Sequence, residues 1–150
     1  MIYVDTSVIA AYYLPEPHTQ AAQDFLRKTP EAGVSDLVEV EFFSALARRV
    51  RMGDLHRQDA ERISALFISH LEGQAYTRLS MERDAYQTAR AWLGAFEFPL
   101  RTLDALHLAA AANHGVPIAT LDRALARAAD GLGIRVRRIG RQSTGTAPAT

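Results

Sequence analysis

Short apolar runs alternate with longer segments of helical periodicity along nearly the whole chain, and this alternation limits the folds that the chain can adopt. Strands separated by helices predict βαβ units, in which helices cover both faces of a mostly parallel sheet. The predicted strands are residues 2–4, 33–35, 74–79, 117–120 and 134–139, the last with the alternating arginines of an edge strand. The predicted helices are residues 8–14, 16–28, 36–51, 58–72, 82–96, 102–114 and 122–130. The fold class is therefore α/β, with three layers.

One domain accounts for the chain, because 150 residues with 48% hydrophobic content suffice for a single core. We expect this domain to span residues 1–140 and the polar segment 141–150 (RQSTGTAPAT) to form a disordered tail. No apolar stretch approaches the ~20 residues of a membrane span, and the N-terminal MIYVDTSVIAAYYLPEP carries no basic leader. The sequence predicts a cytoplasmic protein without a membrane partner.

Composition excludes several kinds of site. The chain contains no cysteine, so a disulfide, a thiolate zinc site or a cysteine nucleophile is impossible, and any metal must bind to oxygen or imidazole. The formal net charge is +0, which argues against nucleic-acid affinity from a globally basic surface. Arginines cluster at residues 48–51 and 135–141, and their forked side chains suit phosphate, although for composition alone a GC-rich genome is the preferred explanation.

Two aspartates follow predicted strands. Asp5 ends the first strand and Asp122 follows the strand 117–120, so both belong at the carboxyl edge of a parallel sheet, where function collects. For each residue alone, an N-cap is the better interpretation. The pair is more suggestive of a site, in which the hydroxyls of Thr6, Ser7 and Thr120 would support the carboxylates.

A third candidate, Asp104, lies at the start of an apolar helix. As a single residue it is an ordinary first-turn acid. Thr102 already offers a cap, however, and an unpaired carboxylate among leucines and alanines would be costly. His107, one turn further, is interpreted as structural.

The fourth acid comes from Val38-Glu39-Val40-Glu41-Phe42-Phe43, where two carboxylates interrupt a hydrophobic helix. Helical periodicity does not choose between Glu39 and Glu41. Four converging carboxylates would repel one another, so the arrangement predicts a divalent cation, Mg²⁺ or Mn²⁺, held by oxygen ligands. Hydrolysis of a phosphodiester bond is the reaction that such a site supports.

Four stretches carry a resemblance to a known family. They are Ile2-Tyr3-Val4-Asp5-Thr6-Ser7, the helix Glu41-Phe42-Phe43-Ser44-Ala45-Leu46-Ala47-Arg48, residues 100–112 (LRTLDALHLAAAA) and Ala119-Thr120-Leu121-Asp122-Arg123-Ala124-Leu125. Together they resemble PIN domains and, among these, the VapC-type toxins of bacterial toxin–antitoxin pairs. The resemblance covers nearly the whole chain, up to about Ile139.

This resemblance implies a site and a function. It makes Asp5, Glu41, Asp104 and Asp122 the metal ligands, and the arginine seven residues after the glutamate selects Glu41 over Glu39. It further implies an Mg²⁺- or Mn²⁺-dependent endoribonuclease that cleaves structured RNA, forms a homodimer and is blocked by a cognate antitoxin protein.

Three alternatives differ from this interpretation. A PIN domain can serve RNA processing in place of toxicity, or it can bind RNA or protein without cutting, with its acids acting as caps and in ion pairs. An aspartate-nucleophile phosphatase would need a second aspartate two residues after the first, where this chain has Ser7.

Overall fold

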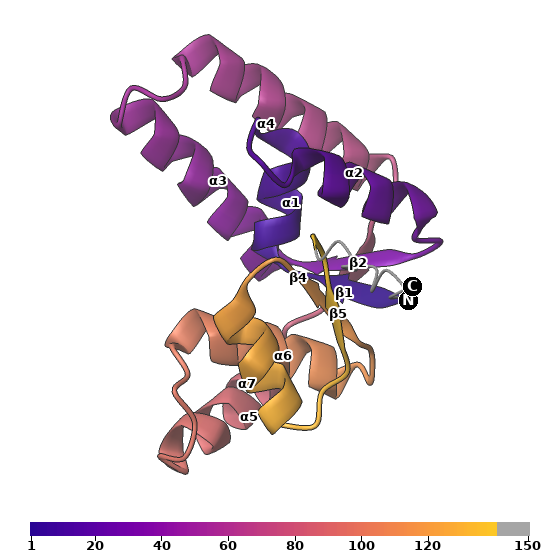
Figure 1. Ribbon diagram of the computed structural model, residues 1–150, viewed down its shortest axis with the longest axis vertical. Helices are drawn as coiled ribbons and strands as arrows, with labels where there is room; N and C mark the ends of the chain where they lie inside the picture. Colours follow the sequence, from indigo (N-terminus) through magenta and orange to yellow (C-terminus); the bar gives the residue numbers. More distant parts are fainter. Residues whose placement is uncertain (141–150) are drawn as a thin grey trace, which may run out of the picture.

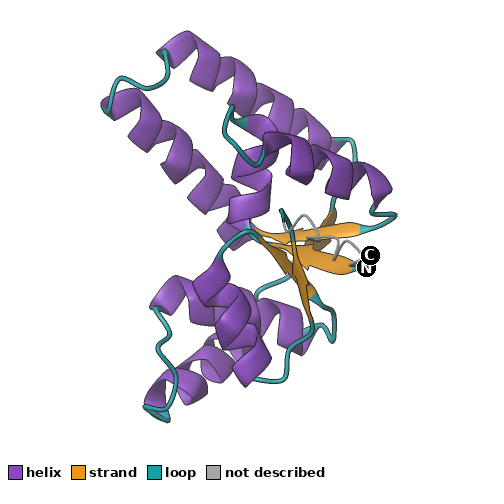
Figure 2. Ribbon diagram, viewed as in Figure 1, coloured by secondary structure: helices purple, strands orange, loops and turns teal. Residues whose placement is uncertain are grey.

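The computed structural model describes residues 1–140, and its elements alternate in the predicted order (Figures 1 and 2). The strands are β1 (Ile2–Val4), β2 (Ala32–Ser35), β3 (Thr77–Leu79), β4 (Ile118–Thr120) and β5 (Val136–Arg138). The helices are α1 (Thr6–Tyr13), α2 (Thr19–Lys28), α3 (Asp36–Arg51), α4 (Arg57–Glu72), α5 (Arg83–Gly94), α6 (Thr102–Asn113) and α7 (Arg123–Gly131). The predicted tail, residues 141–150, lies outside the described residues.

The five strands form one sheet in the order β3-β2-β1-β4-β5, and every neighbouring pair is parallel. In the central strand, Tyr3 lies opposite Gly33 of β2 on one side and Ile118 of β4 on the other. Helices α1 to α4 lie on one side of the sheet and α5 to α7 on the other (Figure 1). The three-layer α/β fold and the edge position of β5 are confirmed.

Some element ends differ from the predicted ranges because of local turns. Helix α2 begins at Thr19 and not at Glu16, since the Thr19 hydroxyl donates to the Leu14 carbonyl (2.9 Å) and accepts from the Glu16 amide (3.0 Å), which closes a turn before the helix. Strand β3 begins only at Thr77. Gln74 has a φ of 60°, a left-handed conformation that suits the end of α4 and interrupts an extended chain.

The two faces of the sheet are packed by different side chains. Toward α3 and α4, aromatic rings fill the core: Phe42 and Phe67 are fully buried, with ring centroids 4.7 Å apart, and Tyr13 lies 5.3 Å from Phe67. On the other face, α6 is buried continuously over residues 105–111, where small alanines let it lie close to the sheet and α5. Within residues 1–140, no helix is long and apolar enough to cross a membrane.

The parallel direction of the strands decides where polar side chains can gather. Asp5 follows β1, Ser35 ends β2 and Thr120 ends β4, so all three belong to one edge of the sheet. All three are buried, with 3%, 3% and 1% of their surface exposed. A buried polar edge of this kind requires specific partners for every group.

Candidate active site

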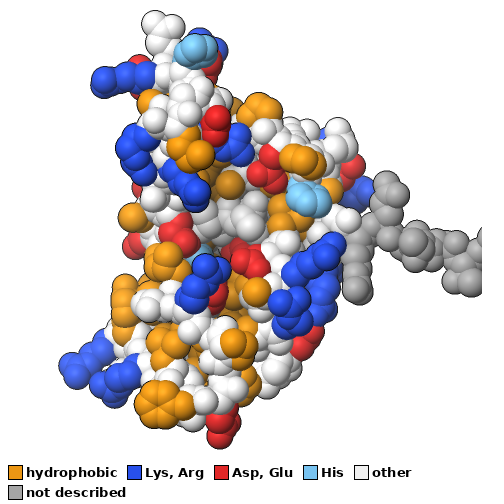
Figure 3. Space-filling model, turned by 60° about the vertical axis from the view of Figure 1, so that its left-hand side comes forward, with side chains coloured by type: hydrophobic (Ala, Val, Ile, Leu, Met, Phe, Trp, Pro, Cys, Tyr) orange, Lys and Arg blue, Asp and Glu red, His pale blue; other side chains and the backbone are white. Residues whose placement is uncertain are grey.

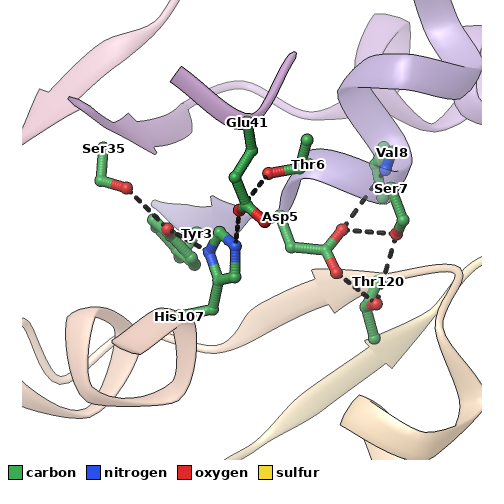
Figure 4. Close-up of polar contacts among 9 residues, drawn as sticks. All are labelled: Tyr3, Asp5, Thr6, Ser7, Val8, Ser35, Glu41, His107 and Thr120. Atoms are coloured by element: carbon green, nitrogen blue, oxygen red, sulfur yellow. Dashed lines mark hydrogen bonds and ion pairs between the residues drawn. The ribbon is translucent and has the colours of Figure 1, made fainter. Parts of the chain in front are cut away.

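Asp5 lies at the centre of this edge, at the junction of β1 and α1. Its Oδ1 accepts hydrogen bonds from the Ser7 hydroxyl (2.6 Å) and the Val8 amide (3.3 Å), and its Oδ2 accepts one from the Thr120 hydroxyl (2.6 Å) (Figure 4). The bond from Val8 makes Asp5 the N-cap of α1, as the sequence predicted for Asp5 taken alone. The carboxylate is thus fixed at both oxygens by β4 and α1.

The surroundings of Asp5 disfavour its charged form. Burial raises the pKa of the Asp5 carboxyl group, because desolvation outweighs the hydrogen bonds from Ser7 and Thr120 and the attraction of His107. All of its hydrogen-bond donors are neutral hydroxyls or an amide. A carboxylate in such a place gains most from a nearby cation.

Glu41 and Glu39 leave α3 in different directions. The Glu41 Oε1 accepts from the Thr6 hydroxyl (2.8 Å) and contacts the His107 Nε2, so this side chain belongs to the sheet edge. Glu39 forms an ion pair with Arg78 (3.3 Å) beside β3. Periodicity could not separate the two glutamates, whereas the structure gives Glu41 alone a contact with this polar edge.

The environment of Glu41 is opposite to that of Asp5. Desolvation raises the pKa of Glu41, but the hydrogen bond and charge of His107 and the hydrogen bond from Thr6 outweigh it, so the pKa of Glu41 is lowered. The side chain is also less enclosed, with 22% of its surface exposed. The pKa values of two carboxylates at one edge are therefore shifted in opposite directions.

Asp104 and Asp122 are partly exposed and are held by local contacts. Asp104 in the first turn of α6 lies 3.4 Å from the Arg101 Nε, and 19% of its side chain is exposed. Arg101, and not Thr102, occupies the N-cap position of α6, so the predicted Thr102 cap was wrong. The Asp122 Oδ1 accepts from the amides of Ala124 (2.8 Å) and Leu125 (3.1 Å), which is the predicted N-cap of α7.

The four acids are not assembled into a closed metal cage. Within residues 1–140, no three acidic or histidine side chains converge closely enough to bind one ion in their present conformations. Each of the three less buried acids nevertheless has one carboxylate oxygen with no protein partner in this range: Oε2 of Glu41, Oδ1 of Asp104 and Oδ2 of Asp122. Hard oxygen donors of this kind, together with the desolvated Asp5, fit Mg²⁺ or Mn²⁺ by their chemistry.

The predicted supporting hydroxyls all contact these acids, and three further residues join them. Thr6 bonds Glu41, whereas Ser7 and Thr120 bond Asp5. Sequence reasoning missed Tyr3 and Ser35 entirely and assigned His107 no role beyond structure. The Tyr3 hydroxyl lies 2.7 Å from both the Ser35 Oγ and the His107 Nδ1, over separations of 32 and 104 residues that no local pattern reports.

A groove beside Asp122 brings basic side chains to the same edge. It is lined by His18, Arg123, Arg127 and Arg138 together with Asp122, and we call it the arginine groove. Among residues 1–140, Arg123 and Arg127 form no ion pair with a carboxylate. Figure 3 shows acidic side chains near the middle of one face, bordered by Lys and Arg side chains. Among the described residues, unpaired positive charge is therefore present in the arginine groove although the formal net charge of the whole chain is zero.

The raised pKa of Asp5 gives a pH-dependent prediction for the metal-free protein. The folded protein holds this proton more tightly than the unfolded chain, so the stabilisation is present at low pH and is lost as pH rises through the folded pKa. Asp5→Asn cannot lose a proton, so its unfolding free energy minus that of wild type should increase as pH rises above about 4, the ordinary pKa of an aspartate in the unfolded chain. Urea denaturation in EDTA measures this difference. The exposed Asp54→Asn is the control, and a difference for Asp5→Asn that is flat or falls with pH would contradict the assignment.

Comparison with known proteins places this geometry in a family. A family model for the PIN domain matches residues 2–131. The chain is 31% identical over 138 residues to Ribonuclease VapC46 of Mycobacterium tuberculosis, covering 90% of this chain and 95% of that protein. It is 28% identical over 128 residues to Ribonuclease VapC3 of Pyrobaculum aerophilum, covering 83% of this chain and 92% of that protein.

Solved structures share the fold. VapC20 of Mycobacterium tuberculosis, a Sarcin-Ricin loop cleaving toxin, matches with a TM-score of 0.67 and 21% identity over 85% of this chain and 95% of its own. VapBC2 of Rickettsia felis, bound to a DNA fragment from its promoter, matches with a TM-score of 0.69 and 13% identity over 93% of this chain and 100% of its own. The predicted resemblance is confirmed: this chain belongs to the PIN-domain family, and VapC ribonucleases are among its sequence relatives.

Proposed function

We propose that this protein is a divalent-metal-dependent endoribonuclease that acts as the toxin of a toxin–antitoxin pair. The observation that carries the proposal is the buried Asp5 carboxylate beside Glu41 at the carboxyl edge of a PIN-domain sheet. The two sequence relatives are both named ribonucleases, which supports RNA as the substrate.

The metal dependence rests on the donor set. Asp5, Glu41, Asp104 and Asp122 would hold Mg²⁺ or Mn²⁺, and the cation would supply Lewis-acid stabilisation of a phosphodiester undergoing hydrolysis. The chain's own contribution is orientation: Ser7 and Thr120 fix Asp5, and Thr6 fixes Glu41. Asp104 would exchange its present partner, Arg101, for the cation, whereas Asp122 would offer Oδ2 and keep Oδ1 as the cap of α7.

The arginine groove gives the RNA backbone a path to this edge. Arg123 and Arg127 lie one turn apart on α7, immediately after Asp122, and can bind phosphates on either side of the bond to be cut. This local arrangement answers the objection from neutral net charge, because phosphate contacts depend on charges within a Debye length of about 8 Å and not on the total.

The proposed partners are an antitoxin and a second copy of the chain. Solved structures with this fold include FitAB bound to a DNA fragment and DNA-bound VapBC from Salmonella typhimurium, which supports an antitoxin protein as partner. An exposed apolar surface at α5 and α6, including Phe96 (93% exposed), Tyr86 (55%) and Leu103 (45%), supports a homodimer.

One observation favours a different function. Every one of the four acids already has a partner within the protein, as caps and ion pairs would require in a PIN-like module that binds RNA or protein without cutting it. A cleavage assay separates that module from a nuclease. Growth on expression separates a toxin from a housekeeping RNA-processing nuclease.

The first prediction of this proposal concerns the acids. Asp5→Asn, Asp104→Asn and Asp122→Asn should each reduce Mn²⁺-dependent cleavage of a panel of structured RNAs by orders of magnitude, because each removes a charged metal ligand at almost constant volume. Glu41→Gln should have the same effect, whereas Glu39→Gln, which disturbs only the exposed pair with Arg78, should leave cleavage nearly unchanged.

Circular dichroism verifies that each variant is folded. Full activity in a folded Asp5 or Asp104 variant would refute the assignment of that residue. Loss of activity in Glu39→Gln but not in Glu41→Gln would reverse the choice between the two glutamates. No metal-dependent cleavage by wild type would favour the non-catalytic binding module.

The second prediction concerns the arginine groove. Arg123→Gln and Arg127→Gln should each raise the KM for RNA about fivefold, equivalent to about 1 kcal/mol, with little change in kcat. Each should also reduce the slope of log KM against log salt by about 1, because one phosphate contact is lost. Arg57→Gln, at the start of α4 and paired with Glu61, is the matched control. An unchanged KM and salt slope in both groove variants would exclude this path for RNA.

The third prediction concerns the biological role. Induced expression of wild type without its partner should arrest bacterial growth, because uncontrolled RNA cleavage stops translation, and Asp5→Asn should relieve the arrest. Immunoblotting verifies equal protein levels. Unimpaired growth with active wild-type protein present in the cells would favour the housekeeping nuclease.

A further inference from the structure

A chain of buried hydrogen bonds crosses the core and ends on Glu41. The Ser35 Oγ and the Tyr3 hydroxyl are 2.7 Å apart, and the Tyr3 hydroxyl is 2.7 Å from the His107 Nδ1. The His107 Nε2 then contacts the Glu41 Oε1 (Figure 4). We call Ser35, Tyr3 and His107 the relay; it joins β2, β1 and α6 to the glutamate of α3.

The relay is costly unless its polar atoms are fully satisfied. Ser35, Tyr3 and His107 have 3%, 0% and 4% of their surfaces exposed, and within residues 1–140 no buried side-chain nitrogen or oxygen lacks a hydrogen-bond partner. Phenylalanine at position 3 would pack in the same place without a buried hydroxyl that needs hydrogen-bond partners. Ser35 also occupies the N-cap position of α3, but its hydroxyl bonds to Tyr3 and makes no capping hydrogen bond to the helix.

The chemistry of the end group sets the direction of the bond between His107 and Glu41. A carboxylate only accepts hydrogen bonds, so the His107 Nε2 carries a proton and donates to Glu41. On the other side of the ring, Nδ1 contacts the Tyr3 hydroxyl, which in turn contacts the Ser35 hydroxyl. These contacts at both ring nitrogens fix the orientation of His107 and direct its Nε2–H at Glu41.

The relay has a consequence for the Glu41 carboxylate. The donors from Thr6 and His107 both bind Oε1, and Oε2 has no protein partner among residues 1–140. Two donors on one oxygen prevent rotation of the carboxylate and leave the other oxygen available for a ligand. His107 also lies one turn after Asp104 on α6, so one helix carries a candidate ligand and the group that orients another.

We propose that His107, whose ring is held by Tyr3 and Ser35 with its Nε2–H directed at Glu41, is a positioning residue that orients Glu41 for binding of the divalent cation. This inference rests on the proposed metal-dependent function. It predicts that the N–H directed at Glu41 matters for cation affinity, whereas a histidine that merely fills the core would contribute only to stability.

Two substitutions of His107 separate these roles. A glutamine side chain can place an N–H near the position of Nε2, whereas asparagine reaches only to the position of Nδ1. The full-length chain is stripped of metal, and Mn²⁺ binding is measured by isothermal titration calorimetry beside thermal denaturation in EDTA. We expect His107→Asn to weaken Mn²⁺ binding about 10- to 100-fold and His107→Gln only about 3-fold, with similar losses of melting temperature in EDTA.

Controls and a second variant keep the test decisive. His114→Asn and His114→Gln, at an exposed histidine, should leave Mn²⁺ affinity unchanged. Tyr3→Phe removes only the hydroxyl that contacts Nδ1 and should weaken Mn²⁺ binding about 10-fold, so it replaces His107→Asn if that variant fails to fold. Long-range proton–nitrogen NMR in EDTA should detect a proton on the Nε2 of His107 in wild type, without any metal.

The outcomes distinguish this inference from the proposed function. Equal Mn²⁺ affinity in His107→Asn and His107→Gln, or a His107 without a proton at Nε2 in wild type, would overturn the positioning role while wild-type binding and cleavage still support the nuclease. Wild type that neither binds Mn²⁺ nor cleaves RNA would overturn the proposed function, and the positioning role with it. The predicted order of affinities, wild type above His107→Gln above His107→Asn, supports both.

Discussion

The burial of one carboxylate, Asp5, organises the edge of the sheet where the candidate site lies. Both of its oxygens are held by hydroxyls, and one of these, the Thr120 hydroxyl, also accepts a hydrogen bond from the Asp122 amide (2.9 Å). The Ser7 hydroxyl likewise accepts from the Leu121 amide (3.0 Å). The charged group that is most costly to bury thus connects β1 and α1 to the loop that starts α7. Removing its hydroxyl partners would loosen both helix starts together.

The contrast between Asp5 and Glu41 shows how neighbouring acids acquire different properties. Asp5 receives only neutral donors in a desolvated position, and its pKa rises; Glu41 receives an imidazole N–H and remains partly exposed, and its pKa falls. The pKa of Asp5 is raised by burial, whereas that of Glu41 is lowered by its partners, so the two carboxylates differ although they lie at one edge. A divalent cation would favour the charged form of Asp5, so the proposed cation binding is expected to depend on pH.

Chain direction made much of this arrangement predictable. Because Asp5 and Asp122 each follow a strand of a parallel sheet, the sequence placed both at one edge, and their capping roles followed from local helix chemistry. The choice between Glu39 and Glu41 depends on Arg78 and His107, which are distant in sequence, so helical periodicity could not make it. The relay escaped prediction for the same reason: nothing near Tyr3 in the sequence indicates a partner 104 residues away.

The four acids differ in how firmly the fold holds them, and this difference suits a site that closes around a ligand. Asp5 and Glu41 are fixed by buried or half-buried partners from other elements, so their orientation is determined before any cation arrives. Asp104 is held by Arg101, a side chain that is 81% exposed, and such a pair contributes at most about 1 kcal/mol. The cap formed by Asp122 contributes about 0.5–2 kcal/mol, and both of its hydrogen bonds go to Oδ1. Oδ2 could therefore bind a cation without loss of the cap. Recruiting these two partly exposed acids would therefore cost little, which explains how the open arrangement of the four carboxylates is compatible with the proposed metal-dependent reaction.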